Sequence, residues 1–178
     1  MTEIRVRDKK FELFLPEDVI LKGIKTVAES INRDLRDKNP LFICVLNGAF
    51  MFAADLMKQL DFPCEVSFIR LKSYQGTKAG GAVKEVQGLN ESIENRHVVI
   101  IEDIIDTGHT MYYLMEKMKG EHPASLKVAT LLFKPTALQS DIRPDYVAIE
   151  IPNDFIVGYG LDYDGHGRNL NSIYKIKE

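Results

Sequence analysis

The chain has 178 residues, of which 45% are hydrophobic and 28% charged, and its net charge is −3. This length and composition are those of one globular domain with its own core. No basic run suggests nucleic acid as a partner, and no apolar segment reaches membrane-spanning length. The first residues do not form a signal peptide, so we expect a cytoplasmic protein with no membrane partner.

Strand-like and helix-like segments alternate along the chain. Apolar residues at helical spacing predict helices over residues 17–31, 50–60 and 111–118. Short apolar runs predict strands at residues 11–15, 41–46, 65–71, 98–101, 126–133 and 146–149, and 83–86 is a further candidate. The alternation predicts an α/β fold, with a mostly parallel central sheet of about five strands flanked by helices.

The stretch from residue 98 to 110 carries the clearest chemical signal. An apolar run ends at Glu102 and Asp103, and a turn with Gly108 then leads into a helix. Ligands of open α/β sheets bind beyond the carboxyl ends of strands, and a helix start offers N–H groups to a phosphate. The carboxylates would repel a phosphate on its own. Either the carboxylates hold the hydroxyls of a sugar or a Mg²⁺ that accompanies the ligand, or the turn binds only a metal. A ribose phosphate satisfies the first arrangement, with its hydroxyls on the acidic pair and its phosphate on the turn.

Two other interpretations of this stretch stay open on pattern alone. In the first interpretation, Asp106 or Thr107 is simply the N-cap of an ordinary helix. In the second, an aspartate at the strand end holds Mg²⁺ and accepts a phosphoryl group, as in response regulators. A Walker A loop is excluded, because no GK[ST] follows a glycine at the required spacing.

Residues 102–110, EDIIDTGHT, resemble the phosphoribosyl pyrophosphate (PRPP) signature of type I phosphoribosyltransferases, in the form of the hypoxanthine-guanine branch. The resemblance implies transfer of 5-phosphoribosyl from PRPP to N9 of hypoxanthine or guanine, with Mg²⁺ as cofactor and assembly into dimers or tetramers. It implies that Asp106 is the general base for the purine N7 proton. It assigns ribose and 5-phosphate binding to Glu102, Asp103, Asp106, Thr107, Gly108, His109 and Thr110.

Other segments match further parts of the family pattern. Pyrophosphate contacts are implied for Leu46, Asn47, Gly48, Arg70 and Arg168. Family members often carry lysine at the position of Asn47, and they hold a non-proline cis peptide there. Ser73 and Tyr74 resemble the loop that closes over the substrates and excludes water.

The tail of the chain resembles the family's purine-binding hood. The resemblance implies base contacts from Lys134, Phe155, Ile156 and Asp162, and Mg²⁺ contacts from Glu102, Asp103 and Asp162. Lys134 would select a 6-oxo over a 6-amino purine, because an ammonium donates and cannot accept. We expect one domain over residues 1–178, with a core at about 16–150 and a hood from about 1–15 and 151–178.

Three rival functions remain from the sequence. The first is a regulator that senses PRPP without catalysis, and the second is an RNA-binding regulator of the same fold. Neither a DNA-binding module nor a basic face is evident, which argues against the first, and the net charge of −3 argues against the second. The third is an enzyme of the same type acting on another base, such as xanthine or uracil.

Overall fold

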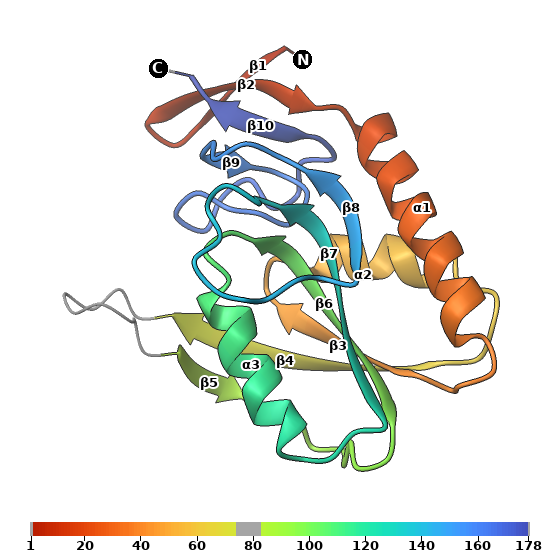
Figure 1. The fold of residues 1–178 in the computed structure, drawn as a ribbon. Helices are drawn as coiled ribbons and strands as arrows, with labels where there is room; N and C mark the ends of the chain where they lie inside the picture. The colour runs from red at the N-terminus through yellow and green to blue at the C-terminus, as the bar shows by residue number, and fades with distance from the viewer. Residues whose placement is uncertain (1, 74–82, 178) are drawn as a thin grey trace.

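A computed structural model describes residues 2–73 and 83–177, which form two β-sheets and three helices (Figure 1). The strands of the larger sheet are β3 (Leu41–Leu46), β4 (Glu65–Ser73), β5 (Val83–Gln87), β6 (His97–Ile105), β7 (Ser125–Phe133) and β8 (Tyr146–Glu150). Those of the smaller sheet are β1 (Glu3–Val6), β2 (Lys9–Leu15), β9 (Ile156–Val157) and β10 (Ile173–Ile176). The helices are α1 (Glu17–Leu35), α2 (Phe50–Met57) and α3 (His109–Lys119).

The larger sheet has the strand order β5-β4-β3-β6-β7-β8. All neighbours from β4 to β8 pair in parallel, and only β5 at the edge is antiparallel. The five parallel strands flanked by helices confirm the predicted fold class. The apolar runs of β3 and of β6 up to Ile101 are buried, as expected for strands covered on both faces.

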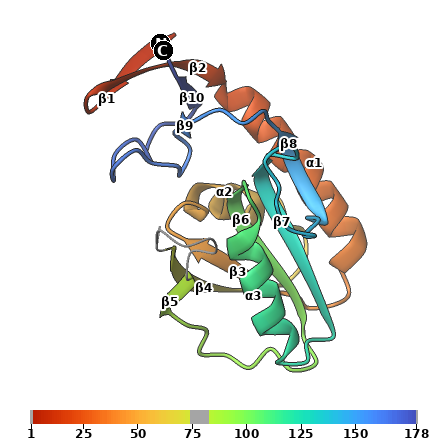
Figure 2. The ribbon, with the colours of Figure 1, turned by 60° about the vertical axis from the view of Figure 1, so that its left-hand side comes forward.

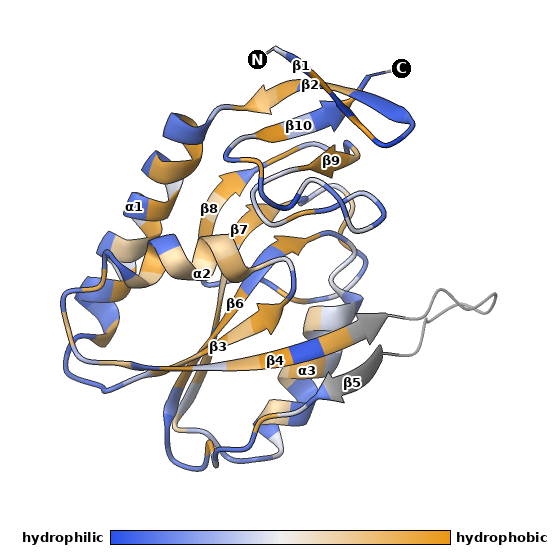
Figure 3. Ribbon diagram, turned by 180° about the vertical axis from the view of Figure 1, so that it is seen from behind, coloured by the Kyte–Doolittle hydropathy of each residue, from blue (hydrophilic) through white to orange (hydrophobic). Residues whose placement is uncertain are grey.

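Helices cover the two faces of this sheet separately. The apolar side of α1 packs with α2 against residues such as Phe42 and Ile101, whereas α3 packs through Met111 and Leu114 against the opposite face. Figure 2 shows α1 and α3 on opposite sides of the sheet. Figure 3 shows mostly hydrophobic strands inside and a hydrophilic outer side on α1. Within the described residues, no helix combines the length and apolarity needed to cross a membrane.

The smaller sheet forms a hood above the carboxyl ends of β6 and β7 (Figure 1). Its order is β1-β2-β10-β9, so both ends of the chain contribute strands. β10 lies between β2 and β9 and pairs antiparallel with both. Phe11, Val157 and Tyr174 form its buried centre. The hood is therefore held together by segments more than 140 residues apart in the sequence.

Several boundaries differ from the sequence-based expectation. β6 extends to Ile105, so Glu102 and Asp103 belong to the strand rather than to the turn after it. α2 ends at Met57, earlier than the apolar spacing up to residue 60 predicts. β10 was not predicted, because its four residues carry no distinct pattern, and its pairing with β2 is a long-range contact.

Candidate active site

A cleft opens at the carboxyl ends of β3 and β6, where the direction of strand order reverses. The chain passes from β3 to β4 on one side and returns to β6 on the other side of β3. Such a switch point is the usual ligand site of open α/β sheets. The cleft has a volume of about 340 Å³ and is lined by Val45, Leu46, Gly48, Leu71, Glu102, Asp103, Ile104, Thr110, Asp162 and Arg168.

Glu102 and Asp103 form an acidic pair at the floor of the cleft. The Glu102 side chain is buried, and one of its carboxylate oxygens accepts a hydrogen bond from the Asp103 N–H at 3.2 Å. Burial raises the pKa of Glu102 well above its ordinary range, and the Asp103 charge adds to this. Burial also raises the pKa of Asp103, although hydrogen bonds and the Arg168 charge oppose the shift. The cleft thus holds negative charge that a hydroxyl donor or a cation would stabilise.

The turn before α3 has the geometry of an anion site. Gly108 adopts φ +81°, a left-handed conformation, and stands as the N-cap of α3 without any side-chain capping bond. The interpretation of Asp106 or Thr107 as a helix cap is therefore wrong. A smaller cavity of about 100 Å³ faces this turn and is lined by Glu102, Ile104, Ile105, Asp106, Thr107, Gly108, Thr110 and Met111. The first N–H groups of an α-helix have no partner within the helix, and they stand at the positive end of its dipole, so the start of α3 beside this cavity suits an anion.

Lys134 points into the site rather than into solvent. Its side chain is only 7% exposed, and its Nζ lies 3.0 Å from Asp106 Oδ2. The same Nζ donates to Asn153 Oδ1 at 3.2 Å. Asp106 is half-exposed and comes from the turn of residues 106–110 at the start of α3, called the phosphate turn below, whereas Asn153 comes from the segment leading to β9. A buried ammonium and a carboxylate are thus paired between the core and the hood.

The hood supplies an aromatic surface and an ion pair. Phe155 is 48% exposed, with its ring centroid 6.3 Å from Phe11 and 5.9 Å from Tyr163. It is therefore not a core residue, and part of its ring is open to a ligand. Asp162 pairs with Arg168 at 2.6 Å, and both side chains line the cleft. Ile156 is buried in β9.

The remaining residues of the sequence-based site are less clearly placed. The Leu46–Asn47 peptide is cis, as the resemblance implies, and Asn47 is exposed. Arg70 is exposed on β4 beside Leu46 but lines neither cavity. His109 is exposed at the start of α3. Ser73 ends β4 with its side chain undescribed, and the prediction for Tyr74 lies outside the described residues.

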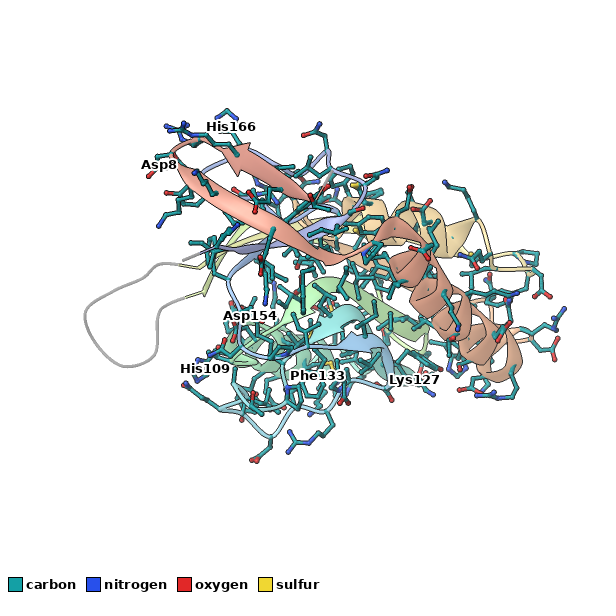
Figure 4. All side chains as sticks on the ribbon, turned by 90° about the horizontal axis from the view of Figure 1, so that it is seen from above. Asp8, His109, Lys127, Phe133, Asp154 and His166 are labelled. Carbon is teal, nitrogen blue, oxygen red and sulfur yellow. The ribbon has the colours of Figure 1, made fainter. Side chains whose placement is uncertain are left out.

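Two further observations qualify the site. Within residues 2–73 and 83–177, no three His, Cys, Asp or Glu side chains gather as a metal-binding group. A larger hollow, of about 550 Å³, lies elsewhere, on the hood between β1 and residues 166–170. Figure 4 shows His166 and Asp8 at that outer edge. Size alone therefore does not identify the active site.

Sequence reasoning missed Asn153, although it stands in the segment that resembles the hood. An exposed asparagine next to a proline reads as a turn residue, and only the fold reveals its contact with Lys134.

The fold, the phosphate turn and the acidic pair define an enzyme that handles a phosphorylated sugar at the switch point of a parallel sheet. The model of the phosphoribosyl transferase domain matches residues 15–164. The chain belongs to this phosphoribosyltransferase family, which confirms the resemblance seen in the sequence.

Relatives with high similarity share a specific name. The chain is 44% identical over 173 residues to a hypoxanthine-guanine phosphoribosyltransferase of Streptococcus thermophilus, covering 97% of this chain and 96% of the relative. It is 42% identical over 179 residues to a hypoxanthine-guanine-xanthine phosphoribosyltransferase of Tritrichomonas foetus, covering 100% and 98%. A solved hypoxanthine-guanine phosphoribosyltransferase of Bacillus anthracis superposes with TM-score 0.89 at 35% identity, covering 93% and 98%.

Proposed function

We propose that this protein transfers the 5-phosphoribosyl group from PRPP to N9 of hypoxanthine or guanine, giving IMP or GMP and pyrophosphate. The observation that carries the proposal is the Lys134–Asp106 pair, which lies between the phosphate turn and the hood. A regulator that only senses PRPP needs the turn and the acidic pair. It has no use for a buried ammonium paired with a carboxylate between the core and the hood.

Asp106 and Lys134, whose side chains lie 3.0 Å apart, act on one edge of the purine, where N7 of the five-membered ring is next to the 6-oxo group of the six-membered ring. The Asp106 carboxylate accepts the N7 proton as N9 attacks the anomeric carbon, a general-base role that contributes about 10²–10⁴-fold. The Lys134 ammonium donates to the 6-oxo group and cannot accept from a 6-amino group. The exposed face of Phe155 stacks on the base, and backbone carbonyls of Ile156 and Asp162 accept from the guanine amino group.

PRPP occupies the two adjoining cavities. The ribose hydroxyls bind Glu102 and Asp103, and the 5-phosphate binds the turn from Asp106 to Thr110. Pyrophosphate lies near Leu46, Asn47, Gly48, Arg70 and Arg168. Ser73 and Tyr74 belong to the loop that covers the substrates.

The donor set fits Mg²⁺ carried in with PRPP. The carboxylates of Glu102, Asp103 and Asp162 supply oxygen ligands in the cleft. A cation there would also stabilise the negative charge of the buried Glu102–Asp103 pair. Mg²⁺ commonly takes one or two carboxylates together with substrate phosphates rather than a closed protein cage. Glu102, Asp103 and Asp162 would hold it directly or through water. When bound, the ion offsets the charge of the leaving pyrophosphate.

The organisation follows from this division of roles. Residues 1–178 act as one domain, in which the core at about 16–150 binds PRPP and the hood at about 1–15 and 151–178 binds the base. We also propose a cytoplasmic enzyme that assembles into dimers or tetramers, with no nucleic-acid or membrane partner. Xanthine is the second candidate base, because the Tritrichomonas foetus relative is named for it.

A spectrophotometric transfer assay tests the proposal. Purified protein is given PRPP and Mg²⁺ with hypoxanthine, guanine, xanthine, adenine or uracil in separate reactions. We expect turnover of hypoxanthine and guanine that a chelator abolishes. The variant Asp106→Asn should lower kcat at least about 100-fold while IMP still binds. Asp141→Asn, an exposed carboxylate in the β7–β8 loop, is the matched control and should retain full activity.

Tight PRPP binding without turnover of any base would assign the protein to the regulator class. Turnover of uracil or adenine in place of the 6-oxopurines would overturn the roles given to Lys134 and the hood.

A further inference from the structure

Tyr159 links the hood to the core through its hydroxyl group. The residue follows β9, its side chain is 1% exposed, and its Oη donates a hydrogen bond to Asp55 Oδ2 on α2. It adopts φ +49°, where a residue other than glycine is strained. Such strain persists only where the surrounding contacts impose it. The structure therefore holds this buried hydroxyl on a helix of the core, 104 residues away in sequence.

Asp55 is a strong acceptor for this bond. Its carboxylate also pairs with Lys58 at 2.6 Å, one turn further along the chain. Burial acts to raise the pKa of Asp55, but the hydrogen bonds from Lys58 and Tyr159 outweigh it and lower the pKa. Burial likewise raises the pKa of the Tyr159 hydroxyl, which stays a donor. A hydrogen bond to an ionised carboxylate is about twice as strong as a neutral one.

The next hood residue contacts the turn from which α2 starts. Gly160 has φ +97°, and a Cβ there would lie 2.0 Å from the Gly48 carbonyl oxygen. Gly48 in turn packs on the Asp103 carboxylate, because a Cβ on Gly48 would lie 1.5 Å from Asp103 Oδ2. Two neighbouring hood residues thus contact the same segment of the core. Gly160 packs on the turn at Gly48, and Tyr159 donates to Asp55 on the helix that follows this turn.

Gly160 also determines where two cleft side chains lie. Arg168 donates from Nη1 to the Gly160 carbonyl at 2.7 Å and pairs through Nη2 with Asp162 at 2.6 Å. Both side chains line the cleft that also contains Gly48 and Asp103. A shift of the segment at Tyr159 would therefore move Asp162 and Arg168 relative to the acidic pair.

We propose that Tyr159 and Asp55 are positioning residues that fix the hood on the turn at Gly48 and on α2, and so set the purine against the ribose carbon. Neither residue touches the reacting atoms. Their effect passes through Gly160 to the cleft, and through the backbone from β9 to Phe155. The inference rests on the proposed function, because it concerns the alignment of base and PRPP.

The experiment compares two tyrosine–carboxylate pairs. Tyr159→Phe and Asp55→Ala are made singly and together, with Asp55→Asn as the conservative variant that keeps an acceptor oxygen. Tyr146→Phe is the control, because the buried Tyr146 donates to Asp34 at 3.1 Å wholly within the core, between β8 and α1. Steady-state kinetics with hypoxanthine and saturating PRPP and the Tm are measured for each variant.

We expect Tyr159→Phe and Asp55→Ala each to lower kcat/KM for hypoxanthine about ten-fold, the size of one charge-assisted hydrogen bond. The loss should lie in KM, with kcat within two-fold of the wild type. The double variant should be no worse than Asp55→Ala alone, and Asp55→Asn should retain more activity. Because Asp55 keeps its Lys58 partner, Tyr159→Phe leaves no unpaired charge and should remain folded. Tyr146→Phe should lower Tm but leave kcat/KM within two-fold.

If the wild type is active, an unchanged kcat/KM in Tyr159→Phe would overturn this inference and leave the proposed function standing. An equal loss of kcat/KM in Tyr146→Phe and Tyr159→Phe would have the same consequence. A wild type with no turnover of any 6-oxopurine would overturn the proposed function and this inference together.

Discussion

Replacing Glu102 by glutamine should stabilise the ligand-free protein. The side chain is 7% exposed beside the Asp103 carboxylate, and its raised pKa reports a charge that the fold does not compensate. Glutamine keeps the shape and an oxygen that can accept the Asp103 N–H bond. Relieving a buried, uncompensated charge yields about 1–3 kcal/mol. For a chain of this length, 1 kcal/mol raises Tm by roughly 2–4 °C, so an increase of about 2–12 °C is expected.

The pH dependence has a definite sign. The folded-state pKa of Glu102 lies above its ordinary value of 4.5, so the folded protein binds the proton more tightly than the unfolded chain. The resulting stability is fully present below pH 4.5 and is lost as the pH rises through the folded-state pKa. The advantage of Glu102→Gln over the wild type should therefore grow with pH and level off above that pKa.

Thermal unfolding followed by fluorescence between pH 5 and 8, with a chelator present, measures both effects. Glu29→Gln, which removes an exposed carboxylate on α1, is the matched control and should leave Tm within 1 °C, as for most surface changes. The same Glu102→Gln variant should raise the KM for PRPP. A Tm of Glu102→Gln below that of the wild type at pH 8 would refute the reasoning that the charge of Glu102 destabilises the folded protein.

Three more outcomes are expected. Lys134→Gln should raise the ratio of adenine to hypoxanthine kcat/KM at least about ten-fold, because an amide also accepts hydrogen bonds; an unchanged ratio in the transfer assay would contradict this. Gly108→Ala should cost at least about 1–2 kcal/mol, since φ is +81° and its Cβ would lie 2.2 Å from Ser140 Oγ; calorimetry should show a Tm lower by roughly 2–8 °C. Burial, with the nearby acidic pair, raises the pKa of Cys44 to about 12, so a disulfide reagent at pH 8 should reach only Cys64 until the protein unfolds.

Local patterns predicted the parts of this fold that depend on local causes. The run at residues 98–101 and the glycine turn at Gly108 act through β-propensity and backbone freedom, which belong to the residues themselves. The sheet class follows from the alternation of such runs with helical spacing. Charge and position made a ribose phosphate one candidate ligand of the acidic segment, and the resemblance to the PRPP signature selected it over a helix cap or a phosphoacceptor aspartate.

Long-range contacts could not be obtained in the same way. Lys134 taken by itself resembles a solvated lysine at a strand end, and its burial depends on Asp106 and Asn153 from two other segments. The bond between Tyr159 and Asp55 joins residues whose spacing has no periodic meaning. β10 pairs with β2 across almost the whole chain, so nothing near residue 173 could indicate its partner.

The topology of the hood also determines the order in which parts of the enzyme can fold during synthesis. The ribosome releases β2 early, but β2 cannot pair with β10 until the last residues of the chain have emerged. Meanwhile β3, β6 and β7 can already assemble the phosphate turn and the acidic pair. We therefore expect the nascent chain to acquire the proposed sugar-phosphate site before the hood that would cover the base. Stalling or truncation ahead of residue 173 would leave β2 and β9 as open edges, ready to pair with another chain.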